Sequence, residues 1–128
     1  MRKKVLVVED HADSREMLEI ALTREGYSVI TSEDGQDGLD LAKRERPDIV
    51  ISNLNMPNLD GMEMIQQLRQ EPALAGVIIV VVSAVRTENP QALINAGVNA
   101  VMSKPVELTE LLQTISDAFQ SIGANNQA

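Results

Sequence analysis

Several polar residues follow apolar runs of the sequence and carry side chains that could do chemistry together. They are Glu9 and Asp10 after VLVV (5–8), Asn53 after DIVIS (48–52), Ser83 at the end of VIIVVVS (77–83), and Lys104 after AVMS (100–103). Two adjacent carboxylates bind a hard cation such as Mg²⁺ through oxygen. The cation, a Lys ammonium and a Ser hydroxyl can each engage one phosphoryl oxygen. The set predicts a phosphoryl-binding site.

One member of this set has the wrong chemistry for an acceptor. Phosphoryl transfer to a side chain here requires an ionised carboxylate, and position 53 holds an amide. The amide oxygen of Asn53 can ligate a metal and accept hydrogen bonds, but it is not a useful nucleophile toward phosphorus. Taken singly, each polar residue fits an ordinary turn or surface position. Their expected place on one edge of a sheet favours a functional site.

The apolar runs alternate with segments of helical pattern. The runs are VLVV (5–8), YSVI (27–30), DIVIS (48–52), VIIVVVS (77–83) and AVMS (100–103). The third and fourth lack polar alternation, which is typical of strands buried on both faces. Repeated strand–helix units predict an α/β doubly wound fold with one parallel sheet. In such sheets ligands bind beyond the carboxyl ends of the strands, where the polar residues stand.

Each expected helix has its own boundary signals. The first helix should begin with a capping box of Asp13 and Glu16 and end at Gly26, and the second should begin after Asp34 and end before Pro47. The third should begin at Gly61, and the fourth should begin with Asn89 and Pro90 and end at Gly97. The last helix shows an apolar period near 3.6, carried by Leu108, Leu111, Leu112, Ile115, Phe119 and Ile122.

Size and charge restrict the class of protein. The chain has 128 residues, with 11 basic against 19 acidic side chains, a net charge of −8. We expect a single domain over 1–122 and a polar tail over 123–128. The acidic surface disfavours nucleic-acid and anionic-membrane binding. Cysteine is absent, which excludes disulfides and thiolate zinc sites. The N-terminal apolar run is too short for a signal peptide or membrane span, so we expect a cytoplasmic protein.

The chain resembles the receiver domain of bacterial two-component response regulators over residues 3 to about 122. The matching stretches are KVLVVED, PDIVISNLNMPNLDG, VVVSA and GVNAVMSKPV. The resemblance implies a flavodoxin-like (βα)5 fold with a five-stranded parallel sheet in the order 2-1-3-4-5. It matches Glu9 and Asp10 to the two acidic residues that bind the metal in the family. It matches Asn55 to the residue whose backbone carbonyl completes the Mg²⁺ shell. Ser83 and Lys104 match the residues that contact the phosphoryl group.

The chain departs from the family pattern at two positions. Asn53 falls on the phospho-accepting Asp, and Val101 falls where many members carry Tyr or Phe. We therefore expect a non-phosphorylatable form. The metal shell of Glu9, Asp10, Asn53 and Asn55 should bind Mg²⁺ more weakly, because affinity follows ligand charge. The amide is either natural or an engineered Asp→Asn change. The retention of every other site residue favours a deliberate substitution.

By this resemblance the function is that of a phosphorelay receiver domain, not an enzyme. The partners would be a sensor histidine kinase or phosphotransfer protein. A downstream protein or a homodimer would use the fourth and fifth helices. The alternative is a natural pseudo-receiver that acts as an interaction module independent of phosphorylation. It would dock through Leu18 and its neighbours, or around Ala92 and Leu93, although ordinary core packing is the favoured interpretation of those residues.

An enzymatic function, such as a metal-dependent phosphatase or a nucleotide-binding protein, is disfavoured. No Gly-rich phosphate loop follows the first strand, where VVEDHADS stands, and Asn53 removes the nucleophile. His11 lies next to the acidic pair and could shuttle protons, but a lone loop His more often has no catalytic role.

Overall fold

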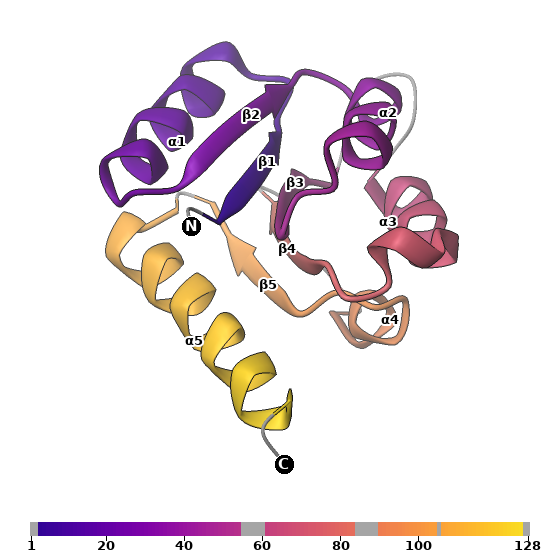
Figure 1. The fold of residues 1–128 in the computed structure, drawn as a ribbon. Coiled ribbons are helices and arrows are strands. Elements are labelled where there is room, and N and C mark those ends of the chain that lie inside the picture. Colours follow the sequence, from indigo (N-terminus) through magenta and orange to yellow (C-terminus); the bar gives the residue numbers. More distant parts are fainter. Residues whose placement is uncertain (1–2, 55–60, 84–89, 105, 127–128) are drawn as a thin grey trace.

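A computed structural model of the chain describes residues 3–54, 61–83, 90–104 and 106–126. Five parallel strands form one sheet in the order β2-β1-β3-β4-β5, which confirms the flavodoxin-like fold (Figure 1). The strands are β1 (Lys4–Val8), β2 (Ser28–Ser32), β3 (Ile49–Asn53), β4 (Ile78–Ser83) and β5 (Ala100–Ser103). The helices are α1 (Ala12–Arg24), α2 (Gly35–Glu45), α3 (Gly61–Gln70), α4 (Pro90–Asn95) and α5 (Leu108–Asn126), with a short 3-10 turn at Pro72–Leu74.

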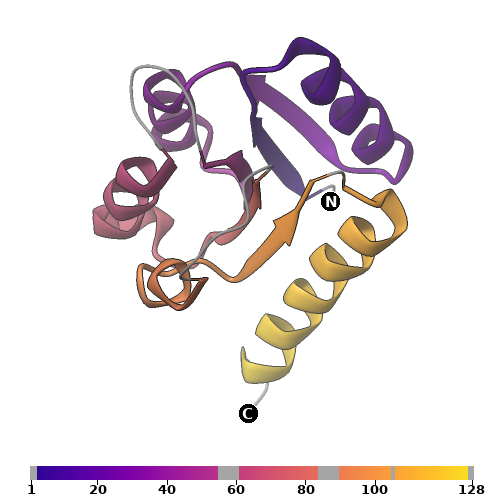
Figure 2. The ribbon, with the colours of Figure 1, turned by 180° about the vertical axis from the view of Figure 1, so that it is seen from behind.

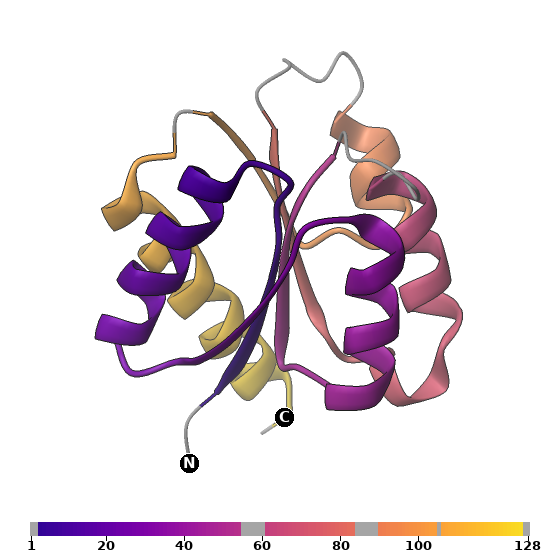
Figure 3. The same ribbon diagram turned by 90° about the horizontal axis from the view of Figure 1, so that it is seen from above.

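The helices cover both faces of the sheet. Opposite views place α1 and α5 on one side and α2, α3 and α4 on the other (Figures 1 and 2), and the view from above shows the sheet between the two layers (Figure 3). Alternate strand residues supply each side: in β1, Leu6 and Val8 face the α2–α3 layer, while Val5 and Val7 face α1 and α5. Burial on both faces explains why these runs show no polar alternation.

Most predicted helix limits are confirmed. The Asp34 side chain accepts a hydrogen bond from the Asp37 N–H at 2.8 Å and caps α2. That helix ends at Glu45, and Arg46 takes the left-handed conformation (φ 49°) before Pro47. Gly26 and Gly97 have φ values of 96° and 110°, as their predicted stop positions require.

Two expectations at helix ends differ from the structure. The capping box at Asp13 is wrong, because α1 begins at Ala12 with His11 as the N-cap and without a side-chain cap. The His11 carbonyl already accepts from the Arg15 N–H at 3.0 Å, so Asp13 lies within the first turn. There its charge favours the helix dipole. Helix α5 continues to Asn126, which makes part of the expected tail helical. Asn89 lies outside the described residues.

A network at the opposite end of the sheet places β5 beside β4. Asn99 exchanges hydrogen bonds with Ile79: its backbone N–H donates to the Ile79 carbonyl and its Oδ1 accepts from the Ile79 N–H, both at 2.8 Å. The Arg69 guanidinium, from α3, donates to Asn99 Oδ1 at 3.1 Å and to the Gly97 carbonyl at 2.7 Å. These contacts set the register that carries Lys104 to the other edge.

Gly61 holds the start of α3 against the end of β3. Its N–H donates to the Leu54 carbonyl at 2.8 Å. A Cβ at this position would lie 2.8 Å from the Leu54 carbonyl oxygen and 2.9 Å from that of Asn53. Both are backbone atoms, so only glycine permits this approach beside the site.

Within the described segments, no helix has the length and apolar character needed to cross a membrane.

We predict that Gly61→Ala lowers the free energy of unfolding by about 1–3 kcal/mol, because overpacking against backbone atoms forces a shift. Gly76→Ala is the matched control, since no atom lies within 4 Å of a Cβ there. The control should change stability by less than about 1 kcal/mol. Urea unfolding of both variants measures the difference, and equal midpoints would contradict the proposed close approach.

Candidate functional site

The predicted site residues gather where the strands end. Glu9 follows β1, Asn53 and Ser83 are the last residues of β3 and β4, and Lys104 follows β5. All strands run parallel, so these ends share one edge of the sheet. The Lys104 N–H donates to the Ser83 carbonyl at 2.8 Å, which fixes the chain after β5 beside the end of β4.

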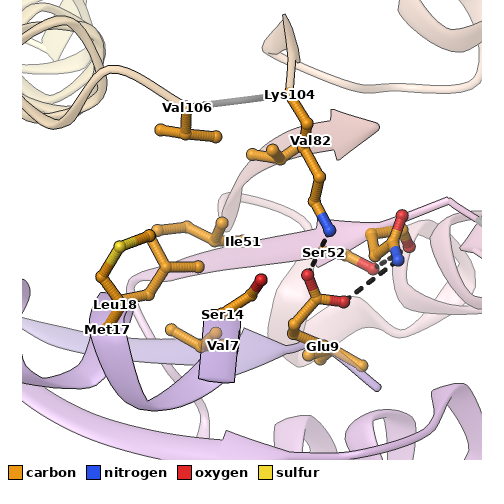
Figure 4. A pocket seen from close by; sticks show the side chains of 12 residues that line it. Val7, Glu9, Ser14, Met17, Leu18, Ile51, Ser52, Val82, Lys104 and Val106 are labelled. Carbon is orange, nitrogen blue, oxygen red and sulfur yellow. Dashed lines mark hydrogen bonds and ion pairs between the residues drawn. The ribbon is translucent and has the colours of Figure 1, made fainter. Parts of the chain in front are cut away.

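Glu9 is the centre of the site. It is only 2% exposed, yet its carboxylate is compensated from two directions. The Lys104 ammonium contacts Oε1 (Figure 4), and the Asn53 amide nitrogen donates to Oε2 at 3.0 Å. A buried charge is tolerated only with such partners, because it has lost its water.

The same amide nitrogen bridges the two acids. Asn53 Nδ2 also donates to Asp10 Oδ1 at 3.1 Å. The sequence indicated only the acceptor role of the Asn53 oxygen and missed this donor role. An amide offers two N–H donors, which is the signal that could have revealed it. In this arrangement the amide nitrogen faces one oxygen of each carboxylate.

The backbone of Glu9 is fixed by residues outside the predicted set. Its N–H donates to the Ser32 carbonyl at 3.0 Å, and its carbonyl accepts from Arg15 Nη1 at 2.9 Å. Arg15 was not predicted, and its position one helical turn after His11 is the only signal for it. These contacts hold Glu9 between β2 and α1.

The protonation of Asp10 reflects its neighbours. Burial is the largest influence and raises the pKa of Asp10. Hydrogen bonding, including the bond from Asn53, together with the nearby His11, outweighs burial and holds the pKa below its ordinary value. Asp10 is therefore an ionised carboxylate at neutral pH.

Glu9, Asp10 and His11 form a group of metal-ligating side chains, and no other such group occurs among the described residues. One ligand atom from each lies within 4.8 Å of the other two. His11 Nδ1 is 3.4 Å from Asp10 Oδ1 and 3.9 Å from Glu9 Oε2. Two carboxylate oxygens facing one point fit a divalent cation by their chemistry.

An apolar cavity of about 540 Å³ adjoins the buried side of this cluster. Its walls carry Val7, Leu18, Ile51, Val82 and Val106, and it reaches Glu9, Asn53 and Lys104 (Figure 4). No sequence pattern predicted this cavity. These walls place apolar side chains beside the Lys104–Glu9 pair.

The remaining candidates have different outcomes. Ser83 is 3% exposed at the end of β4, and Val101 of β5 is half-buried against the α2–α3 layer. Asn55 lies outside the described residues. Leu18 and Leu93 are 6% and 1% exposed, so they are core residues, as favoured, and cannot dock a partner. Ala92 is exposed, so the core interpretation is wrong for that residue. The exposed large apolar residues of the described segments are Met17 and Ile20 of α1 and Ile94 of α4.

Comparison with known proteins identifies the family. The sequence model of the response regulator receiver domain family matches residues 5–116 of this chain. The sensor histidine kinase RcsC of Escherichia coli (strain K12) is 38% identical over 112 residues, 88% of this chain and 12% of the relative. An uncharacterized 14.6 kDa protein of Leptolyngbya boryana is 33% identical, covering 87% of this chain and 86% of the relative.

Solved structures give the same result. The chemotaxis response regulator CheY4 of Vibrio cholerae superposes with a TM-score of 0.87 at 29% identity, covering 92% of this chain and 99% of that one. The chain spans 12% of RcsC and 26% of the transcriptional regulatory protein GlrR of Escherichia coli (strain K12), so it corresponds to one part of those longer proteins. By sequence and by fold, this chain belongs to the response regulator receiver domain family of two-component signalling.

Proposed function

We propose that this chain is a phosphorelay receiver domain in which Asn53 occupies the phospho-acceptor position and prevents phosphorylation. One observation carries the proposal. The Asn53 amide lies at the carboxyl end of β3, within hydrogen-bond distance of both Glu9 and Asp10. A carboxylate at that point would face the cation and the incoming phosphoryl group. The amide oxygen bears no charge to attack phosphorus, so no acyl phosphate forms.

The amide also replaces a repulsive contact with an attractive one. A carboxylate in its place would put a third negative charge about 3 Å from Glu9 and Asp10, where like charges disfavour ionisation. Asn53 instead donates to both acids. In this proposal the amide holds the unphosphorylated state together without a cation.

The site residues fit Mg²⁺, but weakly. Glu9 and Asp10 supply oxygen ligands, and the proposed shell adds the Asn53 side-chain oxygen and the Asn55 carbonyl. When bound, Mg²⁺ would supply positive charge opposite phosphoryl oxygens. The Asn53 amide must turn to present its oxygen, because its nitrogen now faces the carboxylates. The loss of one ligand charge and of these hydrogen bonds both weaken binding.

Membership of the receiver domain family indicates the general class of partner. Receiver domains pair with sensor histidine kinases or phosphotransfer proteins, and we propose the same class here. A downstream protein or a second receiver would bind the face of α4 and α5. The second candidate function is a pseudo-receiver that binds partners independently of phosphorylation. The exposed Met17 and Ile20 of α1, each 45% exposed, favour a protein contact of that kind.

We predict that Asn53→Asp restores phosphorylation. With Mg²⁺ and acetyl phosphate, the new carboxylate attacks phosphorus and acetate leaves, so the variant gains one phosphoryl group by intact mass. The present chain and Asn53→Ala should gain none. Lys104→Ala in the Asn53→Asp background should slow the gain, because it removes the ammonium opposite the phosphoryl oxygens. A gain on the present chain, or none on Asn53→Asp, would reject the proposal.

We also predict that Asn53→Asp lowers the free energy of unfolding by about 0.5–2 kcal/mol in metal-free buffer at neutral pH. Like charges raise the pKa of an Asp placed there in the folded state. The penalty is therefore present above the ordinary Asp pKa of about 3.9 and disappears below it. Gln66→Glu, exposed in the middle of α3 and away from the helix ends, is the control and should change stability by less than about 0.5 kcal/mol. Identical thermal melting of the Asn53→Asp and Gln66→Glu variants at neutral pH would refute the bridging role.

A further inference from the structure

The apolar cavity beside the Lys104–Glu9 pair is larger than an ordinary packing defect. Its volume is about 540 Å³, whereas protein interiors hold few voids larger than a water molecule. An apolar cavity of about 150 Å³ is already large enough to bind benzene or xenon. The volume found here lies within the range of about 300–1,000 Å³ that is typical of small-molecule sites.

The walls of the cavity are aliphatic and come from both the sheet and a helix. They carry Val7 of β1, Leu18 of α1, Ile51 of β3, Val82 of β4 and Val106 just after β5 (Figure 4). The chain has one Tyr, one Phe and no Trp, and neither aromatic ring lines the cavity. An apolar molecule would therefore bury its surface against side chains on several sides.

One end of the cavity is polar but holds no unpaired charge. Glu9 is 2% exposed and reaches the cavity, and its two oxygens already face Lys104 and Asn53. A carboxylate brought there would lie beside Glu9, and an ammonium would lie beside Lys104, so either would lose water without gaining a free counter-charge. The Lys104 ammonium has three N–H donors, so an uncharged hydroxyl can accept from one that does not face Glu9.

The Ser14 hydroxyl supplies a second polar contact. Ser14 lies in the first turn of α1, is half-buried and points into the cavity (Figure 4). It makes no hydrogen bond with the other side chains drawn around the cavity in Figure 4. A hydroxyl both donates and accepts, so Ser14 can bond an uncharged polar group in either direction.

Met17 of α1 lies at the opening of the cavity. It lines the cavity and is 45% exposed. Its unbranched thioether side chain can move aside and pack against molecules of different shape. Met17 and the Lys104–Glu9 pair lie at different ends of the cavity in Figure 4, so entry past Met17 leaves the pair in place.

We propose that this cavity binds a small uncharged molecule with an apolar body and one hydroxyl-like head group. The body lies among the aliphatic walls, and the head group lies between Ser14 and the Lys104–Glu9 pair. The inference goes beyond the proposed function, because it rests on the cavity and requires neither a cation nor phosphoryl transfer. Occupancy would give the domain an input that does not depend on residue 53.

The test is NMR titration of the full chain, labelled with ¹³C in the valine methyl groups, at neutral pH. The probes are hexanol, hexanoate and hexylammonium, which share one apolar body and differ in the charge of the head group. Hexanol should shift the methyl resonances of Val7, Val82 and Val106 in a saturable way and leave those of Val29 in β2 unchanged, because Val29 does not line the cavity. Both charged probes should bind at least about tenfold more weakly, because their burial loses hydration.

Two substitutions fill the cavity from different walls. Val106→Phe and Ser14→Leu should each weaken hexanol binding about tenfold or more, because the larger side chain occupies the space of the ligand. Val29→Phe is the matched control, since Val29 is also half-buried and packs on the same face of the sheet but lies outside the cavity. It should leave hexanol affinity within about twofold of the original value. Thermal melting checks that each variant is folded, and Ser14→Leu decides the result if Val106→Phe does not fold.

The results that would overturn the inference are specific. Shifts that do not saturate would indicate weak contact with the surface, and equal affinity for hexanol and either charged probe would reject the uncharged head group. Unchanged hexanol affinity in Ser14→Leu would place the molecule elsewhere. Hexanol binding in the cavity with no phosphorylation of Asn53→Asp would retain this site and reject the phosphorelay function, whereas phosphorylation without hexanol binding would do the reverse.

Discussion

The buried carboxylate of Glu9 is the constraint on which the site depends. A charge removed from water in this way requires compensation, which two elements supply, while a third fixes the backbone of the same residue. Lys104 after β5 contacts one oxygen, Asn53 at the end of β3 donates to the other, and Arg15 of α1 fixes the carbonyl of the same residue. Because each partner comes from a different element, the requirement of one side chain orders the whole edge of the sheet.

The sheet makes this convergence possible. Parallel strands buried on both faces carry apolar side chains along their length, so polar groups are confined to their ends. The two helix layers cover both faces, so the candidate site lies at an end of the sheet, the carboxyl edge. At that edge an amide and a carboxylate at position 53 have nearly the same shape but opposite effects. The amide joins Glu9 and Asp10, whereas a carboxylate would separate them and need a cation between them.

The sequence predicted the sheet, most strand ends and most helix limits, because these depend on local patterns such as Asp34 before α2 and the Pro47 stop. It also placed Leu18 and Leu93 in the core as the favoured interpretation. The second strand was expected over 27–30, whereas β2 continues to Ser32. The predicted start of α1 was wrong, because the helix begins with the backbone hydrogen bond from the Arg15 N–H to the His11 carbonyl and not with a side-chain cap. The Asn53 bridge, the Arg15 contact and the cavity beside Lys104 were not predictable, because they depend on side-chain directions that spacing does not specify. The roles of Ser83 and Asn55 stay predictions.

The Lys104–Glu9 pair joins residues 95 positions apart in the chain. Contacts of such sequence separation form late, since the entropy of closing a long loop must be overcome before the contact stabilises anything. Glu9 can gain its cationic partner only when β5 has docked at the far edge of the sheet. A half-folded chain can have most of its core and still lack a competent binding edge.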